Sequence, residues 1–460
     1  MPADIAPGEH SDRQTRDWTQ GGMLHNLLSL SWPMVLTEGF AVIVMTLDLV
    51  WVGRLGTTAI AGMGVASMVT MLAMSAEVGL MTGLRAMVAR FVGAGDRAGA
   101  VHVAQQALAI SVFFGAVMTV IGVTIPERLM EVFGVNADVV EAGADYLRIM
   151  SAGMLSFGLR MVADITMQAS GDTVTPMRIT LLTRTVHLVL GPFLILGWGF
   201  VPALGIPGAG ILNVLAHTMA MAIGLWVLST GRSRLRLTLA GFRIDFPMMR
   251  RIVRIGVPAL VMTTQRALGY IVLTWLMAPF GTVALAAHSI VQRVDTFLFL
   301  PSWALSAGAG VLVGQNLGAK QPQRAERSVW LATGLVAALM TVGCLALLVA
   351  AEGIIGLFNP EMELVAAGAS YLRIAAAGYA VMALVITIGQ ALSGAGDTVP
   401  AMIISVIMVW AVQVPLAFLL PDIAGLGVLG VRWAIVGGTV AGAAAYLVYF
   451  RSGRWKYRNL

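Results

Sequence analysis

Twelve long apolar stretches dominate this chain of 460 residues and restrict the folds that it can adopt. Each is close to the roughly 20 residues that an α-helix needs to cross the hydrocarbon of a bilayer. Charged residues make up only 11% of the chain, against about 25% in a typical soluble domain. A backbone surrounded by lipid must satisfy its hydrogen bonds internally, so these stretches are predicted to be transmembrane helices. They lie near residues 27–52, 60–83, 101–125, 140–168, 178–199, 207–229, 252–277, 284–311, 329–350, 364–392, 402–420 and 427–450.

The chain contains an internal duplication with a constant spacing of 225 residues. YLRIMSAG (146–153) recurs as YLRIAAAG (371–378), and SGDTVTPM (170–177) recurs as AGDTVPAM (395–402). Six spans are therefore followed by six more, and an even number of spans gives both repeats the same orientation. We predict an all-α polytopic membrane protein of two six-helix bundles, related by a pseudo-two-fold axis along the membrane normal. Secondary transporters share this architecture, and no GxxxxGK[ST] nucleotide-binding motif is present.

Basic residues gather in the segments that a twelve-span arrangement places on one side of the membrane. The positive-inside rule then predicts that both termini lie in the cytoplasm. The net charge of +6 is attributed to this topology, and no nucleic-acid partner is expected. The predicted segments are a disordered tail (1–22), a first bundle (23–230), a basic connector (231–251), a second bundle (252–450) and a basic tail (451–460).

Several stretches resemble the multidrug and toxic compound extrusion (MATE) family. WPMV (32–35), LDLVWVGRLGTTAIAGMGVA (47–66), AAHSIVQRVDTFLFLPSWALSAGAGVLVGQNLGA (286–319) and the two repeated Gly-Asp-Thr turns carry the similarity, which covers residues 20–455. The resemblance implies twelve helices in two lobes. It also implies efflux of amphipathic, usually cationic compounds driven by H⁺ or Na⁺.

Asp48 is the first candidate for ion coupling because it lies near the end of a long apolar run, residues 27–53. A charge in mid-membrane costs roughly 2.5–3.5 kcal/mol on insertion scales, so intramembrane carboxylates usually face a cavity and serve a function. In the family the aspartate at this position of the first span is commonly linked to ion coupling. The alternative is that Asp48 lies near the outer interface and merely packs with Arg54.

The neighbouring positions depart from the family's sodium-type pattern. There the fifth span often reads Asn-x-x-x-Asp-Pro, whereas here His187 stands for the Asn and Gly191 for the Asp. Asn213 occupies a position in the sixth span where Thr is common. Na⁺ is expected to need several hard oxygen ligands, by analogy with other hard cations, while a carboxylate beside an imidazole can exchange protons near neutral pH. We predict that Asp48, His187 and Asn213 couple transport to H⁺, with Na⁺ as the alternative; His187 could instead be a hydrogen-bonded core residue.

Further polar residues inside the first bundle are candidates for lining a substrate cavity. Glu38 lies ten residues before the aspartate just described, about 15 Å along a helix. Glu77 and Asp164 are internal acids of the second and fourth spans, and Arg160 is placed for a local i,i+4 ion pair with Asp164. Arg184 in the fifth span could neutralise one of these carboxylates.

The second bundle lacks the acidic pair that another branch of the family carries in its seventh and tenth spans. Gln265 and Arg266 stand in place of the Glu, which favours the DinF-like over the NorM-like branch. Three further candidates, His288, Gln292 and Asp295, share one face of the eighth span and could line a cavity. An ion pair between Arg266 and Asp295 is the alternative interpretation.

The predicted function is a proton-coupled antiporter that exports amphipathic, mostly cationic organic compounds from a bacterial cell. It would lie in the inner membrane as a monomer, without a cofactor or bound metal beyond the coupling ion. A flippase for lipid-linked saccharide precursors remains an alternative, because Arg160, Arg184, Arg266 and Arg293 could bind pyrophosphate. No enzyme is predicted, since the sequence contains neither HExxH nor Gly-x-Ser-x-Gly.

Overall fold

The computed structural model describes residues 16–198, 202–423 and 425–458, and every regular element in them is a helix. Eleven of these helices are long and apolar enough to cross a membrane, or twelve if the bent pair α7 (Ala137–Ala152) and α8 (Met154–Ser170) is one span. That pair bends by 45° where α7 meets α8. The all-helical, polytopic fold class predicted from the apolar stretches is confirmed.

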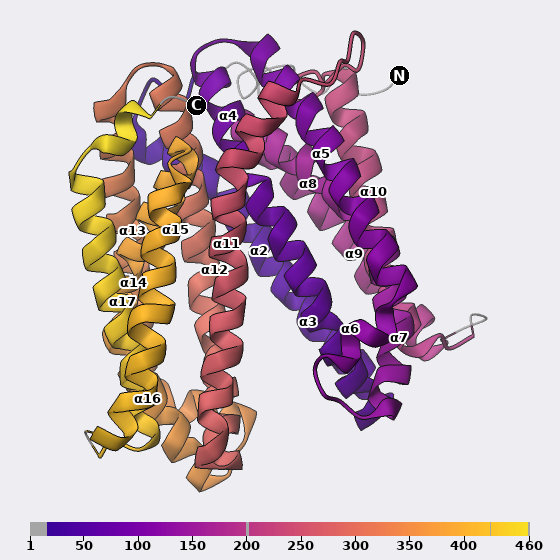
Figure 1. Cartoon of the computed structure of the whole chain (residues 1–460), viewed down its shortest axis with the longest axis vertical. Coiled ribbons are helices and arrows are strands. Elements are labelled where there is room, and N and C mark those ends of the chain that lie inside the picture. The colour runs from indigo at the N-terminus through magenta and orange to yellow at the C-terminus, as the bar shows by residue number, and fades with distance from the viewer. Residues whose placement is uncertain (1–15, 199–201, 424, 459–460) are drawn as a thin grey trace, which may run out of the picture. The chain divides into compact units, whose positions relative to one another are not determined.

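The chain divides into two compact units (Figure 1). The first unit contains residues 36–256 together with the segment before residue 21. Besides α7 and α8 it contains α3 (Thr57–Leu80), α4 (Thr82–Gly93), α5 (Arg97–Thr124), α6 (Pro126–Glu131), α9 (Val174–Leu196) and α10 (Gly205–Thr230). Among these, α10 packs against α8 and α9, and α5 packs against α8.

The second unit contains residues 21–35 and 257–460. Its central helix α14 (Met362–Ala395) packs against α12 (Thr282–Gly318), α13 (Pro322–Phe358) and α17 (Val428–Arg451). The remaining elements are η1 (Ala278–Phe280), α15 (Thr398–Val406), the π-helical η2 (Ile407–Gln413), α16 (Val414–Ile423) and η3 (Arg454–Tyr457).

Two long helices contribute to both units. α2 (Met23–Gly53) and α11 (Phe246–Met277) each carry a unit boundary, after Val35 and after Gly256. The first bundle was predicted to begin at residue 23, whereas the structure assigns residues 21–35 to the second unit. An apolar run shows where a span lies but does not show which neighbours it packs against.

Aromatic side chains anchor the described parts of both terminal segments. Trp18 is buried in the first unit, with the guanidinium groups of Arg16 and Arg234 over its ring. Trp455 is fully buried and stacks on Phe450, with ring centroids 4.9 Å apart. The structure describes residues 16–22 of the tail predicted at 1–22, and residues 1–15 lie outside the described part of the chain.

The duplicated Gly-Asp-Thr turns hold equivalent segments of the two repeats. Gly171 and Gly396 end their helices with φ angles of 94° and 77°, which favour glycine. The carboxylate of Asp172 accepts a hydrogen bond from the Ser233 hydroxyl at 2.8 Å. That of Asp397 lies 3.7 Å from Nε of Arg458. Since 233 and 458 also differ by 225, each turn ties down the segment that follows the sixth span of its own repeat.

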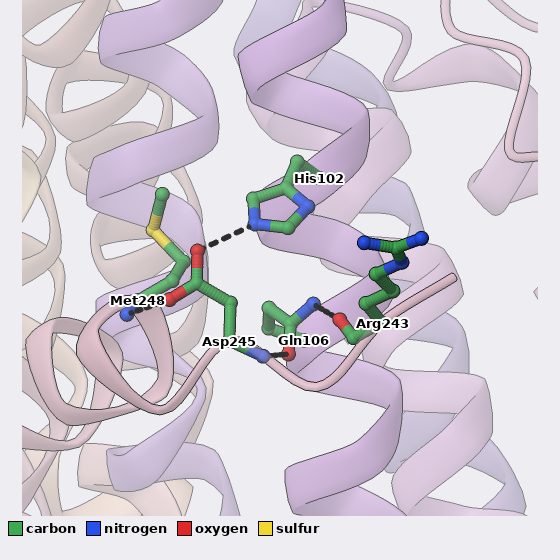
Figure 2. Close-up of polar contacts among 5 residues, drawn as sticks. All are labelled: His102, Gln106, Arg243, Asp245 and Met248. Atoms are coloured by element: carbon green, nitrogen blue, oxygen red, sulfur yellow. Dashed lines mark hydrogen bonds and ion pairs between the residues drawn. The ribbon is translucent and has the colours of Figure 1, made fainter. Parts of the chain in front are cut away.

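The basic connector is fixed to α5 by a set of polar contacts (Figure 2). The side-chain amide of Gln106 accepts a hydrogen bond from the backbone N–H of Asp245 at 3.0 Å and donates to the carbonyl of Arg243 at 2.9 Å. The neighbouring residue on α5, Gln105, donates to the carbonyl of Thr238 at 2.5 Å. These bonds satisfy backbone N–H and C=O groups of the connector, which has no regular secondary structure to pair them. They therefore fix the position of the connector on the first unit.

Asp245 joins the connector to the start of α11. Its carboxylate lies 2.9 Å from Nε2 of His102 and accepts a bond from the backbone N–H of Met248 at 3.0 Å, which is N-capping geometry (Figure 2). The hydrogen bond from His102, followed by that from Met248, lowers the pKa of the Asp245 carboxyl below its ordinary value. Both groups favour the charged form of the carboxyl.

Candidate functional site

Asp48 and His187 form a buried pair between α2 and α9. Oδ1 of Asp48 lies 2.8 Å from Nε2 of His187, and the two residues are 6% and 1% exposed. The other ring nitrogen, Nδ1, is buried without a hydrogen-bond partner among the described residues. With the carboxylate ionised, Nε2–H donates to it, and the neutral ring keeps a lone pair at Nδ1. The pair therefore shares one hydrogen and retains a position for a second.

The space beside this pair is filled by an indole ring. A Cβ atom built on Gly191 would lie 2.1 Å from the ring of Trp51, so the glycine admits the ring at close range. Gly191 is the position where the sodium-type pattern carries a carboxylate. Asn213, the third predicted coupling residue, instead accepts a hydrogen bond from Arg184 at 3.4 Å and donates to the carbonyl of Ala209 at 3.1 Å.

Arginines balance the internal acids of the first unit. The charge of Arg184 is attracted by Asp48 and Glu38 and repelled by Arg160. The exposed carboxylate of Glu38 is acted on by Arg160, Arg85 and Arg184. Arg85 comes from α4, so these acids and bases come from four helices of the unit, namely α2, α4, α8 and α9.

Arg160 connects two further polar residues. Its Nε lies 3.2 Å from a carboxylate oxygen of Asp164, which confirms the predicted i,i+4 ion pair. Its Nη1 lies 3.1 Å from Nδ1 of His217. Since a guanidinium can only donate, His217 accepts at Nδ1, and its ring is neutral in this arrangement. His217 was not among the predicted site residues.

Glu77 is held apart from these groups. It is fully buried and accepts a hydrogen bond from the Ser111 hydroxyl at 2.7 Å, while Oε2 has no partner among the described residues. A Cβ atom on Gly158 would lie 2.0 Å from Oε1 of Glu77. The glycine on α8 therefore makes room for this carboxyl group.

The second unit contains a cavity of about 110 Å³. His288, Gln292 and Asp295 all line it, as their shared helix face predicted. Gln265 does not line it and instead donates weakly to Ser405 at 3.4 Å. In the described part of the chain no ion pair joins Arg266 to Asp295; Arg266 lies 4.4 Å over the Trp303 ring.

Two residues of this cavity were missed from the sequence. The guanidinium of Arg432 lies 2.9 Å from Nδ1 of His288, and the hydroxyl of Tyr379 donates to Asp295. Arg432 is only 3% exposed although it lies near the start of its span. An arginine there usually turns its charged end to the membrane interface. A local charge count over the spans would have identified it as a possible partner for Asp295.

The described residues provide no group of three or more His, Cys, Asp or Glu side chains placed to hold a metal ion. The chemistry that the first unit's arrangement supports is proton exchange between a carboxylate and an imidazole. The titratable groups are brought together from helices that are far apart in sequence.

Comparisons with known proteins agree with this architecture. The MatE family model matches residues 33–193 and 258–419. The probable multidrug resistance protein NorM of Deinococcus radiodurans is 29% identical over 452 residues, covering 95% of this chain and 96% of the relative. The FAD transporter of Shewanella oneidensis is 26% identical, covering 81% and 82%. The expected DinF-like branch is not supported by these comparisons.

A solved structure described as the outward-facing conformation of a multidrug resistance MATE family transporter superposes with a TM-score of 0.88. It is 22% identical in sequence, and the match covers 95% of this chain and 96% of that chain. At this identity the likeness establishes the fold, and the site residues must be judged from their own geometry.

Proposed function

Because the chain belongs to the MatE family of multidrug and toxic compound extrusion transporters, we propose that it exports amphipathic organic cations in exchange for protons. The coupling group is the buried pair of Asp48 and His187, 2.8 Å apart. This pair is the single observation on which the proposal depends. We place the protein in the inner membrane of a bacterial cell, with both termini in the cytoplasm, in line with its bacterial relatives and basic connector.

Proton uptake changes the charge of the site by one. The ionised pair carries one negative charge, and a proton added at Nδ1 of His187 or at the carboxylate cancels it. Arg184, which is attracted by Asp48, then loses part of the negative charge that balances its own positive charge. A cationic substrate about 10 Å away is disfavoured by roughly 1.7 kcal/mol at an effective dielectric constant of 20. That magnitude lies within the usual range of coupling free energies, about 1–3 kcal/mol.

The surroundings of the pair favour H⁺ over Na⁺. A hard cation needs several oxygen ligands, and Asp48 offers one carboxylate beside an imidazole. The position of a second carboxylate is Gly191, against which the Trp51 ring packs. The side-chain oxygen of Asn213 already accepts from Arg184. Protonation requires none of these additional ligands.

The ion choice is tested by efflux of a cationic dye from proteoliposomes under separate pH and sodium gradients. We expect a pH gradient to drive efflux and a sodium gradient alone to drive none. Asp48→Asn should abolish the pH-driven efflux, whereas Glu363→Gln, a change to an exposed acid of the second unit, should leave it largely unchanged. Efflux driven by sodium alone would contradict the proposed coupling ion.

A second candidate is transport of a pyrophosphate-bearing compound, such as a lipid-linked saccharide precursor. The three arginines that act on Glu38 favour it, and one relative is named an FAD transporter. Movement of an undecaprenyl pyrophosphate lipid or of FAD in the same proteoliposomes, without dye movement, would favour this candidate over the first.

A further inference from the structure

The cavity of the second unit differs in polarity from the coupling site of the first. Arg266 and Arg432 contribute two positive charges to its wall, and Asp295 contributes one negative charge. At the repeat spacing of 225, the position of Asp48 corresponds to Leu273, and Leu273 lines this cavity. The second repeat therefore has an apolar side chain where the first has its buried acid.

Hydrogen bonding fixes the protonation of His288. Arg432 can only donate, so Nδ1 of His288, 2.9 Å away, accepts. The neutral ring then carries its hydrogen at Nε2 and donates to the side-chain amide of Gln292, 3.0 Å away. The two ends of an amide are assigned from such bonds, so the carbonyl end of Gln292 faces the histidine. Its NH₂ group remains as a donor on the cavity wall.

Asp295, the acidic group in the wall, already has partners within the protein. The Tyr379 hydroxyl donates to Asp295, and the charge of Arg432 attracts this carboxylate. Arg266 lies with its face over the Trp303 ring, an arrangement that leaves the in-plane N–H groups of a guanidinium for an acceptor. The wall therefore presents an excess of donors and one net positive charge.

We propose that this cavity binds an anionic group, a carboxylate or phosphate, carried on a small apolar or aromatic body. Arg266 and Arg432 supply charge-assisted hydrogen bonds, and the Gln292 amide supplies a neutral one. Tyr270, Phe299 and Met382 supply the apolar part of the lining. A cavity of about 110 Å³ accommodates a single ring or a lipid headgroup. The site is independent of the coupling pair, so it does not rest on the proposed proton exchange.

The test is direct binding to the full-length protein in nanodiscs of zwitterionic lipid. Benzoate and phenyl phosphate serve as anionic probes, benzamide as the neutral analogue and benzyltrimethylammonium as the cation. We expect both anions to bind and the other two to bind at least about tenfold more weakly, since a charge-assisted bond is lost. Displacement of bound benzoate by phosphatidic acid in the discs would identify a lipid headgroup as the source; no displacement would identify a soluble compound.

Variants separate this site from adventitious anion binding. Arg266→Gln removes a charge from a partly buried position and should weaken benzoate binding at least about tenfold. Arg432→Lys keeps the charge but loses the fork geometry and should weaken it as well, with circular dichroism checking that the fold is kept. Arg451→Gln, a change to an exposed arginine of the same unit that does not line the cavity, is the control and should have no effect. Equal binding of the cation, equal losses in Arg451→Gln, or no anion binding would each overturn the proposal.

Discussion

At the scale of single residues, the first unit shows how a carboxylate is kept inside a membrane helix. Asp48 is only 6% exposed and meets His187 from another helix at 2.8 Å. The cost of an unpaired buried charge is avoided by a hydrogen bond to an imidazole that can itself accept a proton. The same pairing makes the group suitable for proton exchange.

Small residues decide where the internal acids fit. Gly158→Ala would bring a Cβ atom within 2.0 Å of Glu77 and 2.2 Å of the Ser111 hydroxyl. Overpacking of this kind typically costs about 1–3 kcal/mol, so we expect a lower melting temperature in detergent. Gly64→Ala is the matched control, because a Cβ atom there meets nothing within 4 Å. Equal melting temperatures for the two variants would contradict the packing described for Glu77.

The sequence was informative about these residues but not about their pairing. Asp48 and His187 could be named because polar side chains are costly in an apolar span. Their contact could not be predicted, since 139 residues separate them and either could have paired elsewhere. Asn213 was expected beside them, yet its amide turns to Arg184. A rotation of a helix about its own axis is enough to exchange such partners, and the periodicity of an apolar span does not fix that rotation.

At the scale of elements, span positions followed from the sequence because the bilayer sets the length of an apolar helix. Local irregularities within a span could not be predicted in this way. The π-helical segment Ile407–Gln413 interrupts an apolar run that reads as a uniform helix, and three of its residues line the cavity of the second unit, namely Met408, Val409 and Gln413. Wide turns of this kind depend on packing, here on Gly442, where a Cβ atom would lie 2.3 Å from the Met408 sulfur.

The connector is held to the first unit by an ionised group, which gives its docking a defined pH dependence. Because the pKa of Asp245 is lowered on folding, its contribution is present above the ordinary value of about 3.9. The contribution is lost as the pH falls through the lowered value. We expect peptic cleavage within the connector to increase as the pH falls below about 4, with the helical circular dichroism signal unchanged.

Asp245→Asn provides the test of this contact at neutral pH. It removes the charge that both His102 and the Met248 N–H favour (Figure 2). Tryptic cleavage after Arg243 should be several-fold faster than in the wild type at pH 7. His25→Ala, a change to an exposed histidine of α2, should leave the rate unchanged. The same cleavage rate in Asp245→Asn and the wild type would show that the connector is held by other contacts.

At the scale of the whole molecule, duplication supplied one architecture and divergence gave the repeats different polar sites. The Gly-Asp-Thr turns keep equivalent roles in both repeats, because each ties down the segment after its sixth span. The buried charges are not equivalent. The first unit places the acid Asp48 beside His187, whereas the second unit places the base Arg432 beside His288. Repeat symmetry could therefore be predicted from the sequence, but the chemistry of each unit had to be derived from its own contacts.

In the proposed function the pair of Asp48 and His187 exchanges a proton for the exported compound, so binding of that compound must release a proton. Proton release can be recorded with a pH indicator when a cationic dye is added to purified protein in weakly buffered detergent. We expect release by the wild type and by Glu363→Gln, a change to an exposed acid of the second unit, and none by Asp48→Asn at dye concentrations that saturate binding. Undiminished release by Asp48→Asn would rule out Asp48 as the coupling group.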